Sequence, residues 1–92
     1  KNVMSQSFYA PENHAYIVIN DISGLSEFTI VVNGVETDLG VGRILKKSRL
    51  DISKYVKKGV NTIEFIIPAD YYGQNSLSAY IEVERAKQYD ER

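Results

Sequence analysis

The sequence lacks cysteine and tryptophan, and it holds little histidine, methionine or proline. Its 92 residues include no Cys or Trp, one His, one Met and two Pro. The absence of cysteine excludes disulfides, thiol catalysis and thiolate metal sites, so a domain of this size must be held together by packing. The single histidine, His14, follows Pro11 in a turn-like segment. We interpret it as a surface or packing residue, because one loop histidine is no catalytic constellation.

Long apolar runs and an excess of charge of one sign are also absent. No run approaches the about 20 apolar residues of a membrane-spanning helix, so we expect no membrane partner. Eleven Lys and Arg balance twelve Asp and Glu, for a net charge of −1. This balance gives no field to attract a phosphate backbone, and the cluster of Lys46, Lys47 and Arg49 is too small for a nucleic-acid footprint. We therefore expect no nucleic-acid partner.

Short runs with strand-like alternation make up most of the sequence, separated by Asn, Asp, Gly and Ser. The pattern predicts strands at residues 4–9, 15–19, 27–32, 61–67 and 76–84. Asn33-Gly34 predicts a type I′ hairpin turn, because both residues tolerate positive φ. Residues 50–59 predict a strand end and one helical turn, with Asp51 or Ser53 as its cap and Gly59 at its end. The chain is therefore expected to be all-β.

Alternation also predicts which side chains form the core. The predicted inward-facing set consists of Phe28, Ile30, Val32, Ile63, Phe65, Ile67, Leu77, Ala79, Ile81 and Val83. The run from Tyr16 to Ile19 is apolar at every position, which predicts an interior strand covered on both faces. Two antiparallel sheets packed face to face, as in a β-sandwich, would bury these side chains.

The charged residues form no complete catalytic or metal-binding set. Glu82 and Glu84 would lie about 7 Å apart on one side of a strand, a spacing that suits glycosidic acid/base catalysis. An outward strand face is expected to carry such charges, so we interpret them as solvated. Loop aspartates Asp21, Asp38 and Asp70 could each offer oxygen to calcium, but no EF-hand spacing joins them. We expect no catalytic residue, no metal and no cofactor.

The segment Tyr71-Tyr72-Gly73-Gln74-Asn75 carries groups that suit a sugar. Tyrosine offers a flat apolar face with a hydroxyl, and side-chain amides offer both donors and acceptors. In a carbohydrate site, Tyr71 and Tyr72 would stack on the sugar and Gln74 or Asn75 would form hydrogen bonds. Packing and ordinary turn chemistry explain the same residues, so both interpretations stay open.

Two segments, FTIVVNG at residues 28–34 and LDISKYVKKGVNTI at residues 50–63, resemble the galactose-binding-domain-like jelly roll. The resemblance is strongest to the sugar-binding domains that accompany family 2 glycoside hydrolases and related enzymes. In that family an Asn-Gly hairpin ends one strand, and the second segment leads into the next long strand. The resemblance extends from about Met4 to Glu84. We expect one jelly-roll domain at residues 1–85, and we interpret residues 86–92, which are mostly charged and show no strand or helix pattern, as a tail or linker.

This resemblance implies a non-catalytic accessory module of a larger bacterial hydrolase that acts on carbohydrate. We expect it to be extracellular or in the cell envelope, to pack against the catalytic domain of its parent chain and to bind carbohydrate weakly through loops. The alternative is an architectural module that packs against protein and binds no sugar. A contiguous apolar patch would favour the alternative, whereas a polar surface with an aromatic-lined groove would favour sugar.

Overall fold

The computed structural model describes residues 2–24, 28–39, 48–67 and 76–83. These ranges form strands β1 (Asn2–Ala10), β2 (Ala15–Ser23), β3 (Thr29–Val32), β4 (Val35–Glu36), β5 (Arg49–Asp51), β6 (Gly59–Ile67) and β7 (Ser76–Val83), with a short 3-10 turn, η1 (Ser53–Tyr55). Each strand pair is antiparallel. The expected all-β class is confirmed. Within the described ranges, no helix is long and apolar enough to cross a membrane.

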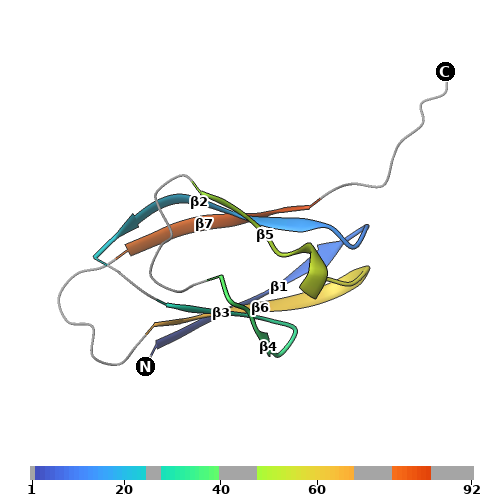
Figure 1. The fold of residues 1–92 in the computed structure, drawn as a ribbon, viewed down its shortest axis with the longest axis horizontal. Helices are drawn as coiled ribbons and strands as arrows, with labels where there is room; N and C mark the ends of the chain where they lie inside the picture. Colours follow the sequence, from blue (N-terminus) through green and yellow to red (C-terminus); the bar gives the residue numbers. More distant parts are fainter. Residues whose placement is uncertain (1, 25–27, 40–47, 68–75, 84–92) are drawn as a thin grey trace, which may run out of the picture.

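The strands form two sheets that face each other (Figure 1). One sheet has the strand order β1-β6-β3-β4, and the other has the order β5-β2-β7. A single cluster of buried side chains joins the layers, with Ile17 and Ile19 from β2 opposite Ile30, Ile63 and Phe65 from β3 and β6. The two-layer antiparallel architecture expected from the sequence is therefore present. In this arrangement β1 and β7 are edge strands of different sheets.

The predicted inward residues of β3 and β6 are buried. Ile30 and Val32 are inaccessible to solvent, and Ile63, Phe65 and Ile67 are nearly so. Just before β3, the ring of Phe28 stacks on the ring of Phe65, with 5.7 Å between centroids and 15° between planes. The core-facing residues predicted from alternation in these two strands are thus confirmed.

Strand β2 departs from the expectation that both of its faces are covered. Ala15, Ile17 and Ile19 are fully buried, whereas Tyr16 and Val18 are half-buried. The expectation was wrong because the described residues place no third layer on the outer face of this sheet. Instead, the guanidinium of Arg49 in β5 lies 3.7 Å from the ring centroid of Tyr16. The apolar run therefore marks the central strand of a small sheet, with a charged side chain covering part of its outer face.

The Asn33-Gly34 turn has the predicted backbone conformation and joins β3 to β4. Asn33 has φ of 52° and Gly34 has φ of 80°. The Asn33 side chain also reaches beyond the turn, because its Nδ2 donates to the carbonyl of Tyr55 at 2.9 Å and to Oδ1 of Asn61 at 2.8 Å. Its Oδ1 accepts the backbone N–H of Thr62 at 3.0 Å. One side chain thus ties the hairpin to η1 and to β6.

Asn61 completes this polar cluster from the buried face of β6, where its exposed fraction is 0%. Its Oδ1 accepts the backbone N–H of Lys57 at 2.9 Å, and its Nδ2 donates to the carbonyls of Lys57 at 2.9 Å and Gly59 at 3.0 Å. We call Asn33 and Asn61 the asparagine pair. Because both amides are well supplied with partners, the pair closes the loop between η1 and β6 without leaving a buried polar group unsatisfied.

The helical turn is shorter than predicted. Its N-cap is Ile52, and Oδ1 of Asp51 accepts the backbone N–H of Ser53 at 2.9 Å. The turn ends at Tyr55, after which Val56 is extended. The expectation that Gly59 ends the turn was wrong. Gly59 instead begins β6, with φ of 105°. Its positive φ lets the chain reverse into the strand, which explains why glycine occupies this position.

Candidate functional site

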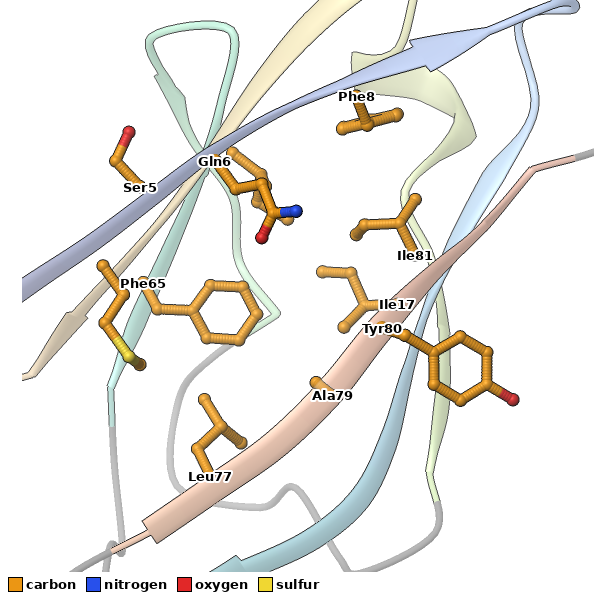
Figure 2. Close-up of a pocket in the computed structure, with 11 residues that line it drawn as sticks. Ser5, Gln6, Phe8, Ile17, Phe65, Leu77, Ala79, Tyr80 and Ile81 are labelled. Carbon is orange, nitrogen blue, oxygen red and sulfur yellow. The ribbon is translucent and has the colours of Figure 1, made fainter.

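An open groove of about 450 Å³ lies between β1 and β7, where the two sheets meet at their edges. Eleven of the described residues line it, and Figure 2 draws them. They are Met4, Ser5, Gln6, Phe8, Ile17, Ile63, Phe65, Leu77, Ala79, Tyr80 and Ile81. None of these residues carries a charge. A concave, mainly apolar surface of this size falls in the range of about 300–1,000 Å³ that is typical of binding sites.

The floor of the groove is part of the core, whereas its walls are accessible. Ile17, Ile63 and Phe65 at the floor are buried. On the walls, Met4 is 45% exposed and Ala79 is also exposed. Phe8, Leu77 and Ile81 on the walls are half-buried. The inward direction predicted for the β7 side chains is therefore correct, but the sandwich does not close over them.

Polar groups reach the groove at few points. In Figure 2 the side-chain amide of Gln6 points between the sheets, toward the side of Phe65 and Ile17. The hydroxyl of Ser5 and the ring of Tyr80 point away from this space. The groove therefore suits an apolar guest that offers one donor or acceptor to the Gln6 amide.

Among the residues that the structure describes, none pairs with the β1 edge of the groove, which presents its backbone groups. The N–H of Asn33 donates to the carbonyl of Thr62 at 2.9 Å, so the backbone of Thr62 faces β3. Because backbone groups alternate sides along a strand, the backbone of Ile63 faces β1, where its partner is Gln6. The residues of β1 whose N–H and C=O groups point to the free edge are consequently Val3, Ser5, Ser7 and Tyr9.

The same reasoning applies to the β7 edge. The N–H of Ile19 donates to the carbonyl of Ser48 at 2.8 Å, so Ile19 faces β5 and its neighbour Val18 faces β7. Val18 is the partner of Tyr80, which therefore directs its backbone groups toward β2. Ala79 and Ile81 direct theirs to the free edge. Two edges with available hydrogen-bonding groups thus flank one apolar groove.

The outer face of the three-stranded sheet carries a second cluster of side chains. Nε of Arg49 donates to Oε1 of Glu82 at 2.8 Å, and its guanidinium covers the ring of Tyr16. The hydrogen bond to Glu82 is the main reason that the pKa of Arg49 is raised above its ordinary value. Both charged side chains are about half exposed, so this is a surface ion pair. Tyr80 follows on the same face and is 52% exposed.

The residues predicted to bind carbohydrate, Tyr71, Tyr72, Gln74 and Asn75, lie outside the described residues. Their contribution therefore stays a prediction. The same applies to Lys46, Lys47, Asp70 and Glu84.

Of the carboxylates considered for catalysis or metal binding, Glu82 is paired with Arg49, and Asp21 and Asp38 are exposed. In the part of the chain that the structure describes, no three His, Asp or Glu side chains gather in a way that could hold a metal ion. His14 is exposed as well, in the turn that joins β1 to β2. The chemistry-bearing side chains of the described residues are thus dispersed over the surface, away from the groove.

Sequence reasoning did not find the groove. The available signal was in β1, where the core-facing positions Met4 and Phe8 flank the polar Gln6 and no charged residue occurs between Asn2 and Ala10. An amide at a core-facing position indicates either a face that is only partly closed, as at Gln6, or a buried amide with hydrogen-bond partners, as at Asn61, because an isolated amide is expensive to bury.

The groove and the two strand edges that flank it are the features of the described residues that best suit binding. Binding there would combine burial of apolar side chains with backbone hydrogen bonds at the edge strands. No protein-family model, no curated protein and no solved structure matches the chain.

Proposed function

We propose that this chain is a non-catalytic accessory β-sandwich module that packs against protein through the groove between β1 and β7. The observation that carries the proposal is the uncharged apolar lining of a groove that stands open between two strand edges. Contiguous apolar surface on a domain of this kind marks an interaction site, since burying it releases ordered water. The architectural alternative is thereby favoured over sugar binding at this place.

The chemistry of the groove supports a protein partner better than a sugar. A sugar ring requires a dense set of hydrogen-bonding groups and an exposed aromatic face. Phe65 offers little face, because it is 8% exposed and already stacked on Phe28. Gln6 supplies one amide where a sugar would require several polar groups. Aliphatic side chains of another protein surface would be buried here without leaving unpaired hydroxyls.

The partner that we propose is the catalytic domain of a parent enzyme. The resemblance to the galactose-binding-domain-like jelly roll supports this, because such modules accompany the catalytic domains of carbohydrate-active hydrolases. In this proposal the enzyme is a bacterial hydrolase of the cell envelope or the extracellular space, and the module is of the jelly-roll type. The surface that meets the groove would be apolar and uncharged, to match the groove.

Oxidation of Met4 tests the proposal, because Met4 lines the groove and is the single methionine of the sequence. Hydrogen peroxide converts an accessible methionine to its sulfoxide, which mass spectrometry quantifies. We expect Met4 to oxidise at least about fivefold more slowly in the parent enzyme than in the isolated chain, because the partner covers it. An equal rate in both would refute packing at the groove.

A Val35→Met variant is the matched control for this experiment. Val35 is 52% exposed in β4, at the edge of its sheet opposite β1. A methionine there should oxidise at the same rate in the parent enzyme and in the isolated chain. Slower oxidation at both positions would indicate general shielding by the parent enzyme instead of a specific interface.

Weak carbohydrate binding is the second candidate function. It is favoured by the half-exposed ring of Tyr80 beside the Arg49 and Glu82 charges, which together offer an apolar face and hydrogen-bonding groups. Titration of the labelled chain with an oligosaccharide panel, followed by NMR, tests it. Saturable shifts at Tyr80, or at Tyr71, Tyr72, Gln74 and Asn75, would support it. A spectrum unmoved by every sugar would contradict it.

A further inference from the structure

The edge of β1, which no described strand covers, suggests how a partner would use the groove, and this inference rests on the proposed function. We infer that an extended, uncharged segment of the partner adds to β1 as a further strand and places alternate apolar side chains in the groove. The four-stranded sheet would thereby become five-stranded. Strand addition of this kind takes affinity from backbone hydrogen bonds and specificity from pockets for alternate side chains.

The first step of the argument is that β1 lacks the features that protect edge strands. Natural edges are blocked by charged side chains, proline, bulges or short length. The nine residues from Asn2 to Ala10 contain no charge and no proline. Their register with β6 runs without interruption, from Asn2 opposite Ile67 to Ala10 opposite Gly59. A long, regular and uncharged edge is open to pairing.

The second step is that β7 is less suited than β1 to pairing with an added strand, although it borders the same groove. Its register with β2 shifts between Ile19 and Asp21, and the strand carries the charged Glu82. The two residues from Ile19 to Asp21 lie opposite the single step from Ala79 to Ser78, so the extra residue is in β2, and this bulge increases the local twist of the pair that β7 forms with β2. The two edges therefore differ, and β1 is the one that a straight strand can follow.

The third step concerns hydrogen bonds. The backbone groups of Val3, Ser5, Ser7 and Tyr9 point to the free edge, as derived above from the pairing of β6. These residues are spaced two apart, or about 6.6 Å along the strand, which is the repeat that an extended partner presents. A segment of about seven residues could therefore satisfy the whole edge.

The fourth step gives the side-chain chemistry of the segment. A strand added at about 4.8 Å from β1 would lie beside the groove mouth, with every second side chain directed between the sheets. There it would meet Phe65, Leu77 and Ile81, which point into this space in Figure 2. Since none of the described residues that line the groove is charged, a charge on the inward positions would be buried without a partner among them. The segment is accordingly uncharged and apolar at alternate positions.

Hydrogen exchange of the β1 amides tests this inference with the isolated chain and a synthetic peptide, acetyl-Thr-Val-Thr-Val-Thr-Val-Thr-amide. In the free chain, the amides of Met4, Gln6 and Phe8 should exchange slowly because they bond to β6. The amides of Val3, Ser5, Ser7 and Tyr9 should exchange fast. We expect saturating peptide to slow the second set at least about tenfold and to leave the first set unchanged.

Two matched controls sharpen the test. The peptide acetyl-Thr-Thr-Val-Val-Val-Thr-Thr-amide has the same composition without alternation, and we expect it to bind about tenfold more weakly because fewer valines reach the groove. The Ser5→Pro variant removes an N–H from the free edge but none that bonds to β6. It should melt like the Ser5→Ala variant, yet lose the protection that the peptide induces at Val3 and Ser7.

The outcomes separate this inference from the proposed function. Shifts of the Leu77 and Ile81 methyl signals without slowing of the four edge amides would overturn strand addition and leave the groove as a packing site. The absence of both the methyl shifts and the slowing would also overturn strand addition. If exchange of the four edge amides slows without peptide, and slows more at higher protein concentration, the edge pairs with a second copy of the chain. This result would also overturn the inference.

Discussion

Two regions of this domain are built in opposite ways. One is a polar cluster closed by hydrogen bonds, and the other is an apolar groove that is open at the edges of the sheets. Around the asparagine pair, Asn33 and Asn61 are joined to each other and to the backbone of η1 and β6 by hydrogen bonds of 2.8–3.0 Å. We call this part, together with the buried core side chains of β2, β3 and β6, the closed region. Along β1 and β7, the open region, the inward side chains that line the groove are half-buried or exposed and the backbone edges are unpaired within the described residues.

The comparison teaches that alternation in a strand fixes the direction of its side chains but not their burial. Ile30 in β3 and Ile81 in β7 both point between the sheets. Ile30 is 0% exposed, whereas Ile81 is half-buried. The difference arises from the neighbours, since β3 lies between β6 and β4 and β7 has β2 as a neighbour on one side. A core position therefore requires cover from the side as well as from the opposite sheet.

The largest effect that should separate the two regions is truncation of these matched isoleucines. Ile30→Ala should lower the free energy of unfolding by about 4 kcal/mol, because it leaves a cavity in a closed core. Ile81→Ala should lower it by about 1 kcal/mol, because solvent already reaches the side chain. Urea unfolding followed by far-UV circular dichroism measures both. Equal losses would show that the groove is closed in solution and would break the comparison.

Truncation of the two core-facing amides should give the next largest difference. Asn61→Ala removes four hydrogen bonds and takes the side-chain partner from part-buried backbone groups of Lys57 and Gly59, so we expect a loss of about 3 kcal/mol. Gln6→Ala removes an exposed amide from the groove and should change the unfolding free energy by less than about 0.5 kcal/mol. The same urea titration tests this pair. A large loss for Gln6→Ala would place that amide in a closed network.

Enlarging an alanine in each region adds side-chain volume instead of removing it, and should give a smaller difference in stability between the two regions. Ala15 is fully buried in β2, so Ala15→Leu should overpack the core and destabilise it by about 2 kcal/mol. Ala79 is exposed on the wall of the groove, so Ala79→Leu should have room and change stability by less than about 0.5 kcal/mol. Thermal unfolding of the two variants and the parent chain measures this. Similar melting temperatures for both would contradict the assignment of an open groove.

Much of the closed region could be predicted from the sequence, because local rules determine it. The Asn33-Gly34 turn follows from the positive φ that both residues tolerate, and Ile63 and Phe65 follow from alternation. The hydrogen bonds between Asn33 and Asn61 could not be predicted, because they join residues far apart in the chain. They depend on how the sheets pack, which local rules do not specify.

The open region could be predicted only in part. The sequence indicates that Leu77, Ala79 and Ile81 point inward, but not which strands are neighbours. Strand order makes β1 and β7 edges of their sheets, and the packing of the two sheets brings them to the same groove. The groove is a product of this non-local arrangement. The predicted sugar-binding loop at residues 71–75 lies outside the described residues, so its role stays a prediction.

Acid should have the smallest effect, and it should act on the closed region. Hydrogen bonds from the hydroxyl and the backbone N–H of Ser53 lower the pKa of Asp51 below its ordinary value. A group whose pKa is lower in the folded chain stabilises the fold above its unfolded pKa of about 3.9, and this stability is lost as pH falls through the folded value. We therefore expect the amides of η1 to lose hydrogen-exchange protection on acidification before those that bond β1 to β6.

The Asp51→Asn variant isolates this effect, because the amide keeps an oxygen that can accept the Ser53 N–H but does not titrate. At neutral pH it should be slightly less stable than the parent chain, since a neutral acceptor makes a weaker hydrogen bond than a carboxylate does. Its η1 amides should lose less protection than those of the parent chain as pH falls below about 4. Identical acid profiles for the two proteins would show that carboxylates other than Asp51 loosen the turn. A simultaneous loss at β1 would show that acid does not distinguish the closed region from the open one.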